Sequence, residues 1–330
     1  MRTILSLTFG TTLSLASMAA DWVTYEPKAG TANGRHIVLL SGDEEYRSEE
    51  GLPQLGKILS QRHGFKCTVL FPINPADGTI DPNIQTNIPG MPSLATADLV
   101  INQFRFRELP DPDMEYFVNY VNSGKPMMIV RTGPHSFQYS RNKQSPYAKY
   151  DWRNKTAGWN GGFGGRTVGE TWTYHHGNHG SEATRGLVDG RNQRHPIVRG
   201  VVDIFGPTDV YGVNPDFPAD ATILVWGQTL NGMNPNDAPN LKKAIMPIVW
   251  LRDYQGETGN ISRTLCSTIG AASDLESEDL RRLLVNACYF LTNLEVPKLA
   301  DVTCVGEFQP TAFGFNKAKK GVKPAEHELK

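Results

Sequence analysis

The segment KPMMIVRTGPHSF, residues 125–137, decides the expected fold class. Its centre, Met127 to Val130, is a continuous apolar run without alternation, which is typical of a strand buried on both faces of a parallel sheet. A Gly-Pro pair then forces a turn, and His135 is expected at the start of the next helix. Ligands of open α/β sheets bind beyond the carboxyl ends of the strands, so Arg131, Thr132 and His135 are expected to face such a crevice. The competing interpretation is an ordinary tight turn whose histidine caps a helix.

The chain before this segment alternates between expected strands and helices. Apolar runs predict strands over residues 36–41, 65–71 and 97–102. Ser48 is expected to cap the helix after the first strand, and Asp111 and Pro112 fit the cap and first position of the helix after the third. Such alternation is typical of right-handed crossover units, so the sequence predicts an α/β protein with a mostly parallel central sheet.

The pattern changes after this segment. From about residue 139 to 190 the periodicity disappears and Gly, Trp, Tyr, Asn and His are abundant. Long loops of this kind are usually functional or disordered, and the aromatic content favours a functional insert. Strands are expected again over 221–226, 245–251 and 261–268. Ser273 and Glu276 match a capping box ahead of an amphipathic helix that ends near Leu291.

Composition bounds the class of protein. The chain has 330 residues, a formal net charge of -1, and 39% hydrophobic and 20% charged residues, so neither a nucleic-acid surface nor an acidic tail is indicated. Residues 1–20 resemble a secretory signal peptide, and no later apolar stretch is long enough to span a bilayer. We therefore expect an exported protein, periplasmic or secreted, with one domain over 21–300 and a mobile tail over 301–330.

The loops that follow the first, third and fourth predicted strands are rich in polar residues. Parallel strands deliver these loops to one edge of a sheet, so we expect them to line one pocket. Arginine favours carboxylates and phosphates, whereas carboxylates suit sugar hydroxyls, metals or proton transfer. For Glu44, a position on a solvated surface loop is as good an interpretation as a position in the pocket. The expected pocket residues are Asp43, Glu44, Glu45, Tyr46, Gln103, Arg105, Arg107, Arg131, Thr132 and His135.

Histidines in the insert offer a candidate metal site. His175, His176 and His179 give His-x2-His and His-x3-His spacings, and Glu170 or Glu182 could complete a divalent-metal site. Hydrogen bonding or a flexible surface run explains the same spacing. No cofactor other than a metal is indicated, since no Gly-x-Ser-x-Gly elbow is present and the Gly-rich run at 161–165 does not follow a strand.

Several stretches in a fixed order resemble the ThuA-like family, named for trehalose utilisation, of the class I glutamine-amidotransferase-like superfamily. The likeness is greatest to exported members from planctomycete-type bacteria and covers about residues 36 to 292. The stretches are residues 36–50, 124–135, 176–180, 195–200, 207–211, 246–250 and the strand that ends at Gly270.

The resemblance implies a flavodoxin-like three-layer sandwich, with the Gly/aromatic-rich segment as an insert. It implies loss of amidotransferase activity, because no cysteine stands at the elbow. It also implies a link to sugar metabolism, particularly disaccharides and oxidised (3-keto) sugars. His135 matches the elbow histidine of the family, and Asp209 and Tyr211 match a shortened Thr-Asp-x-x-Tyr-like segment. Trp250, in the 246–250 stretch, is added to the expected ligand-binding residues.

Three functions are compatible with these patterns. The first is an exported enzyme that uses His135, with Glu44 or Asp209, for acid/base chemistry on a keto-disaccharide or glycoside without an organic cofactor. The second is a non-catalytic sugar-binding module. The third is a metal-dependent hydrolase built on the histidine-rich loop. In the sugar-binding module, the aromatic residues that stack on the glycan would be Trp159, Trp172, Tyr174 and Tyr211. In each case the partner is a small carbohydrate, and the sequence does not predict the oligomeric state.

Overall fold

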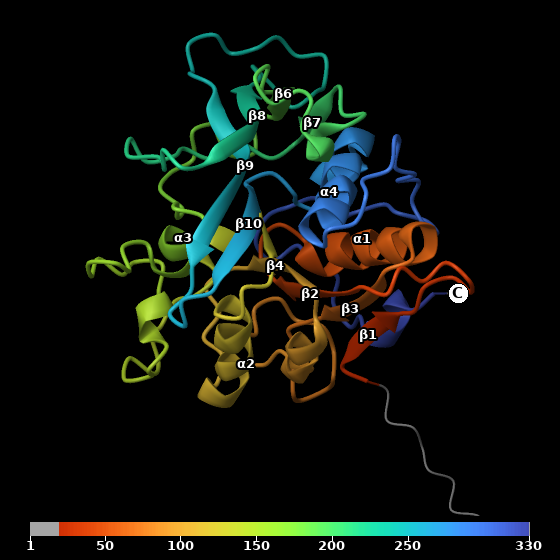
Figure 1. Ribbon diagram of the computed structural model, residues 1–330, viewed down its shortest axis with the longest axis vertical. Helices are drawn as coiled ribbons and strands as arrows, with labels where there is room; N and C mark the ends of the chain where they lie inside the picture. The colour runs from red at the N-terminus through yellow and green to blue at the C-terminus, as the bar shows by residue number, and fades with distance from the viewer. Residues whose placement is uncertain (1–19, 330) are drawn as a thin grey trace, which may run out of the picture.

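A single mixed sheet of ten strands organises residues 20–329, the part of the chain that the computed structural model describes (Figure 1). The signal peptide predicted for residues 1–20 lies outside this part except for its last residue. The strand order is β1-β3-β2-β4-β5-β10-β9-β8-β6-β7. The strands are β1 (Trp22–Tyr25), β2 (His36–Gly42), β3 (Lys66–Leu70), β4 (Leu99–Phe104), β5 (Met127–Val130), β6 (Thr184–Val188), β7 (Ile204–Gly206), β8 (Thr222–Thr229), β9 (Met246–Gln255) and β10 (Ile261–Ser267).

The predicted flavodoxin-like sandwich with a mostly parallel sheet is wrong. Strands β2 to β5 and β10 pair in parallel, but five of the nine neighbouring pairs are antiparallel: β1 with β3, β10 with β9, β8 with β9, β6 with β8 and β6 with β7. Parallel neighbours need long crossover connections, usually helical. Within residues 20–329, helices longer than six residues occur only before β5 and after β10, and β9 turns directly into β10, so the second half of the sheet is antiparallel.

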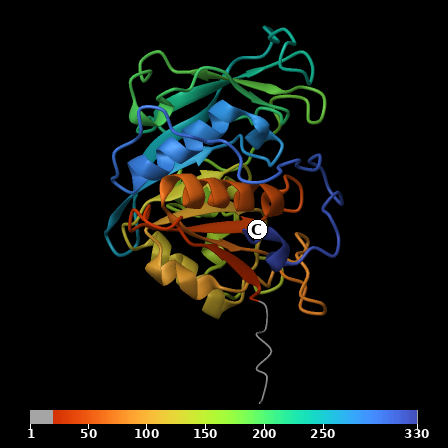
Figure 2. The ribbon, with the colours of Figure 1, turned by 90° about the vertical axis from the view of Figure 1, so that its right-hand side faces the viewer.

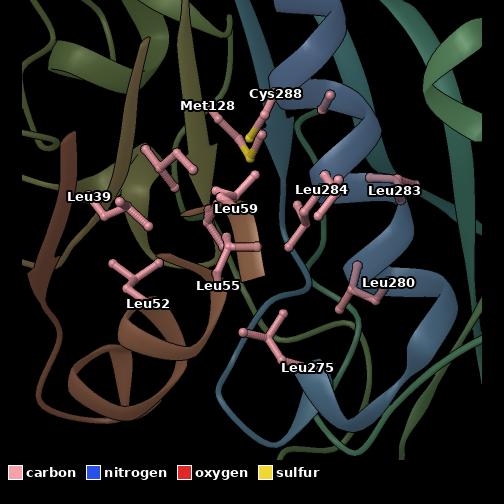
Figure 3. Packing of buried hydrophobic residues seen from close by; sticks show 14 of the residues in the cluster. Leu39, Leu52, Leu55, Leu59, Met128, Leu275, Leu280, Leu283, Leu284 and Cys288 are labelled. Carbon is pink, nitrogen blue, oxygen red and sulfur yellow. The ribbon is translucent and has the colours of Figure 1, made fainter. Parts of the chain in front are cut away.

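Four α-helices cover the sheet in the described part of the chain: α1 (Ser48–His63), α2 (Asp111–Val121), α3 (Gly162–Thr167) and α4 (Glu278–Leu291). Helices α1 and α4 lie side by side on one face (Figure 2). Their leucines pack with Leu39 and Met128 of the sheet and with Cys288 (Figure 3). Val38, Met127 and Ile129 face the opposite cluster, which α2 and α3 cover. The prediction that residues 127–130 are buried on both faces is therefore confirmed. No helix among residues 20–329 has the length and apolarity needed to span a membrane.

Helix starts differ from the prediction by a few residues. Ser48 is the first residue of α1 rather than its cap, and Asp111 is likewise the first residue of α2. The Ser48 hydroxyl lies 2.9 Å from the Ser41 hydroxyl, so it ties α1 to the end of β2. The capping box predicted at Ser273 is absent: residues 274–276 form a short 3-10 turn, and Ser277 caps α4 by accepting a hydrogen bond from the Leu280 amide. His135 ends a 3-10 turn over Gly133–His135 instead of starting a helix.

The segment from 139 to 190 is not wholly irregular. It contains a 3-10 turn (Ala148–Tyr150), α3 and β6. Beyond residue 300, the chain returns to the ends of the first strands. The Gly314 amide donates to the Glu45 carbonyl at 2.7 Å, and a 3-10 turn (Pro324–His327) places the His327 carbonyl 2.8 Å from the Tyr25 hydroxyl. Mobility of this tail stays a prediction.

The start of α1 carries a buried glutamate. Neither carboxylate oxygen of Glu49 accepts a hydrogen bond, and Arg47 Nε lies 3.6 Å from Oε1. Burial raises the pKa of Glu49 to about 8, although the Arg47 charge opposes this shift. Burial outweighs the ion pair because removing the carboxylate from water strongly disfavours its charged form.

Stability should therefore depend on pH through Glu49. The folded state holds a proton that the unfolded state releases above the ordinary pKa of glutamate, so the free energy of unfolding should fall as the pH rises from about 5 to about 9. Urea unfolding across this range measures the fall. Glu49→Gln should flatten it, whereas the exposed Glu307→Gln should not. Equal pH dependence in the wild type and Glu49→Gln would refute the assignment.

Candidate functional site

The loops after β2 and β4 meet through one glutamate. The carboxylate of Glu44 binds two guanidinium groups, pairing with Arg105 Nη1 and, at 2.7 Å, with Arg107 Nη2. Burial raises the pKa of Glu44, while the two arginines act in the opposite direction. Arg107 is itself buried and donates to the carbonyls of Arg105, Pro82 and Ile84. Arg107 therefore builds the loop framework, in contrast to the predicted ligand-binding role.

The loop after β5 joins the same edge. The Thr132 hydroxyl donates to Asp43 Oδ2 at 2.6 Å, and Asp43 Oδ1 accepts from the amides of Glu45 and Tyr46. Asp43 thus holds two loops in register. The central expectation that separate strand ends pool their polar side chains is confirmed for these loops.

Arg131 is the buried cation at the centre of this edge. Its guanidinium lies between two rings, with Cζ 4.2 Å from the Tyr46 centroid and 3.9 Å from the Tyr211 centroid. Nη2 donates to Asp209 Oδ1 at 3.0 Å, and Nη1 donates to the carbonyls of Asp209 and Thr268. Both side chains of the pair are fully buried. Arg131 therefore fixes the carboxylate of Asp209, a role different from direct substrate binding.

Asp209 organises two histidines of the insert. His175 Nδ1 lies 2.7 Å from Asp209 Oδ2, and His179 Nδ1 lies 3.0 Å from Oδ1. The other nitrogen of His179, Nε2, lies 3.3 Å from Glu45 Oε1. Burial alone would raise the pKa of Asp209, but Arg131 and the hydrogen bonds of the two histidines hold it well below its usual range. The hydrogen bond to Asp209 raises the pKa of His179 above its ordinary value.

Beside Asp209 and its two histidines, His135 is surrounded by aromatic rings, which we call the aromatic box. Its ring centroid is 5.3 Å from Phe106, 6.2 Å from Trp172 and 6.3 Å from Tyr211. The side chain is 3% exposed, and Nδ1 has no hydrogen-bond partner. Burial, reinforced by Arg105, Arg131 and His175, holds the pKa of His135 well below its ordinary value. Burial therefore favours the neutral form of the His135 imidazole, and Nδ1 is left without a partner.

Strained backbone is concentrated at this edge. Five non-glycine residues in the described part of the chain have positive φ, and three of them follow β2, β4 and β5: Arg47 (59°), Phe106 (53°) and Arg131 (46°). Such conformations cost about 1–3 kcal/mol each and persist where the surroundings impose them, often at functional sites. Their placement at these strand ends makes this edge of the sheet the candidate functional site.

Some predicted residues lie elsewhere. His176 Nε2 bonds the Ala244 carbonyl at 2.8 Å, so it does not join the other two histidines. Trp250 is wholly buried, and its indole donates to the Val168 carbonyl, so it belongs to the core and not to a ligand pocket. Glu170 is committed to the Asn214 and Thr171 amides, and Glu182 to Lys243 and the Asn178 amide.

Glu45, one of the expected pocket residues, contacts His179. Other residues of the site were not predicted: Phe106 and Trp152 stack with centroids 5.5 Å apart beside His135. Phe313, from the tail, lies 5.4 Å from the His179 ring and stacks on Tyr46. No local pattern links Phe313 to a site about 270 residues earlier.

Comparison with known proteins gives only weak likenesses. Neither a protein-family model nor a curated protein matches the chain. Among solved structures, a ThuA-like protein from Parabacteroides merdae is 14% identical, with a TM-score of 0.49, over 86% of this chain and 98% of its own. The N-terminal domain of mmIFT52 is 13% identical, with a TM-score of 0.42, over 79% of this chain and 99% of that one. The exo-beta-1,4-mannosidase Op5Man5 from Opitutaceae bacterium strain TAV5 is 10% identical, with a TM-score of 0.34, over 81% of this chain and 36% of its own. These values do not establish a family, and the ThuA-like assignment stays a resemblance.

Proposed function

We propose that the protein binds a carbohydrate at the edge formed by His135, His175 and Asp209 and catalyses acid/base chemistry on a keto-sugar, namely an oxidised disaccharide or glycoside. The observation that carries this proposal is the 2.7 Å contact between His175 Nδ1 and the buried Asp209 carboxylate. A buried carboxylate on one imidazole nitrogen sets the tautomer and leaves the other nitrogen to take a proton.

The base is accessible, in contrast to the histidine chosen from the sequence. The His175 side chain is 36% exposed, whereas His135 is buried. Both rings contact Trp172 and Tyr211, so they border the same space. His175 therefore replaces His135 as the proposed base, and His135 is a buried neighbour of the same two rings.

The surroundings suit a sugar. Aromatic rings offer apolar faces to the C–H faces of pyranose rings, and the polar groups between them can bind hydroxyls. Phe106, Trp152 and Trp172 supply partly exposed rings around His135.

The proposed reaction is an elimination. His175 Nε2 takes the proton from the carbon next to the sugar carbonyl, and the electron pair of that C–H bond forms an enolate. The enolate then forms a carbon–carbon double bond while the bond to the glycosidic oxygen breaks. That oxygen takes the proton from the protonated imidazole of His175 as it leaves, so an unsaturated keto-sugar and an alcohol result and His175 is neutral again. General-base assistance of this kind contributes about 10²- to 10⁴-fold.

A panel of 3-keto-glycosides and the corresponding unoxidised glycosides tests this proposal. NMR should show alcohol release from at least one keto-glycoside and none from its unoxidised counterpart. Binding without any turnover would support the sugar-binding alternative instead. Neither binding nor turnover of any sugar would refute the proposal.

A metal-dependent hydrolase is the second candidate, because one donor atom from each of His175, His179 and Asp209 lies within 4.8 Å of the others. Two imidazoles and a carboxylate are a donor set that zinc accepts. Bound there, zinc would supply Lewis-acid activation of water, with Arg131 holding the Asp209 carboxylate. His176, the third predicted ligand, lies outside this set.

Zinc affinity separates the two candidates. If this set binds zinc, the wild type should gain about 2.7 kcal/mol of stability at a zinc concentration of 100 times Kd. His179→Ala should lose the gain, and His176→Ala should keep it. Thermal unfolding with zinc, together with elemental analysis of natively purified protein, measures this. No zinc-dependent shift in the wild type would eliminate the metal candidate.

A further inference from the structure

A hollow lies beside the aromatic rings around His135. It is a cavity of about 730 Å³ formed by the insert and the loop around residues 214–220, and Trp152 and Trp172 form part of its lining. The same two rings contact His135, with centroids 6.5 Å and 6.2 Å away. The two tryptophans therefore border both the cavity and the site around His135 and His175, which we call the histidine site. Ligand pockets in proteins usually measure about 300–1,000 Å³, so the cavity can hold a further small ring.

The charges around the cavity balance. Its charged side chains are Lys155, Arg166, Arg252, Glu170, Asp216 and Asp220. Arg252 Nε bonds Asp220 Oδ1 at 3.0 Å, and the carboxylate of Glu170 is engaged by neighbouring amides. A cavity with balanced charges favours neither an anion nor a cation, because charged ligands need an excess of the opposite charge to replace their hydration.

We infer that this cavity binds the second ring of a neutral disaccharide or longer glycan, with Trp152 and Trp172 shared between the two rings. The inference rests on the proposed function, because it assumes that a first sugar ring lies beside His135 and His175. It narrows the substrate class: a neutral glycan of two or more rings is preferred to a monosaccharide, a sugar phosphate or a uronate.

Filling the cavity tests the inference. Asn160 lines the cavity and lies outside the histidine site. In calorimetric titrations, the wild type should bind trehalose, maltose or cellobiose at least about tenfold more tightly than the corresponding methyl glucoside, a gap of one decade in Kd. Asn160→Trp should reduce this gap to within about twofold while leaving the methyl glucoside affinity unchanged. Asn160→Ala and the exposed Lys143→Trp, which is outside the cavity, should retain the gap.

The outcomes separate this inference from the proposed function. If the wild type binds disaccharides and methyl glucosides equally, or binds glucose phosphate more tightly than either, the inference is overturned while the histidine site still binds sugar. The inference would also be overturned if Asn160→Trp, with its fold verified by circular dichroism, kept the tenfold difference in Kd between disaccharide and methyl glucoside. If neither methyl glucosides nor their 3-keto forms bind or react, the proposed function fails, and the inference fails with it.

Discussion

Asp209→Asn is expected to lower kcat on a reactive 3-keto-disaccharide by about 10²- to 10⁴-fold, the range for loss of a positioned general base. The carboxylate accepts from both His175 Nδ1 and His179 Nδ1. An asparagine side chain offers one acceptor and one donor, so one imidazole must change its tautomer or lose its bond. Arg131 Nη2 also donates to Oδ1, so the asparagine oxygen stays on that side and its NH2 group faces His175. His175 Nδ1 must then accept, which moves its proton to Nε2 and removes the free basic nitrogen.

Glu182→Gln is the matched control for this prediction. Glu182 is also a buried acid that holds the insert, through Lys243 and the Asn178 amide, but it lies outside the histidine pair. Its substitution should leave kcat within about threefold of the wild type, because Glu182 does not contact His175, His179 or Asp209. Equal losses in both variants would mean that Asp209 acts only by holding the insert, and the pH–rate profile of Asp209→Asn would then match the wild type in shape.

Arg131→Met is expected to destabilise the protein by about 3–5 kcal/mol, because it leaves the Asp209 carboxylate buried without its cation. The side chain also loses its place between the Tyr46 and Tyr211 rings. Urea unfolding measures the loss. The double variant Arg131→Met/Asp209→Asn should recover part of it, since no uncompensated charge then remains buried.

An exposed ion pair provides the comparison. Arg263 and Asp253 pair at 2.8 Å with side chains 52% and 45% exposed. Arg263→Met should therefore change stability by less than about 1 kcal/mol. If Arg131→Met were as mild as Arg263→Met, Arg131 would not be the group that fixes Asp209.

The sequence was sufficient for the parallel half of the sheet. Apolar runs and helical periodicity predicted β2 to β5, because strands buried on both faces must be apolar along their whole length. Apolar runs also located β8 to β10, but a run of this kind carries no information on strand direction. The antiparallel pairing of β9 with β10 follows from their five-residue connection, which is too short for a crossover. The prediction instead extended the strand–helix alternation of the first half to the whole sheet.

The site could be predicted only in part. Residues that directly follow strands, such as Asp43, Glu44, Arg105 and Arg131, were recognised because the end of a strand fixes where its loop emerges. The partnership of Asp209 with His175 joins residues 34 apart through an insert without periodicity, so no local pattern could show it. The role of Arg131 was missed for a similar reason, because its partner lies 78 residues away.

Hydrogen–deuterium exchange at the carbon next to the carbonyl of 3-keto-trehalose tests the central claim most directly. NMR in D2O should show enzyme-dependent exchange or elimination with the wild type and with His176→Gln. His175→Gln should lose it by about 10²-fold or more, as expected when a general base is removed. Equal rates in His175→Gln and the wild type would contradict the account, and so would a wild type that is inactive on every keto-sugar.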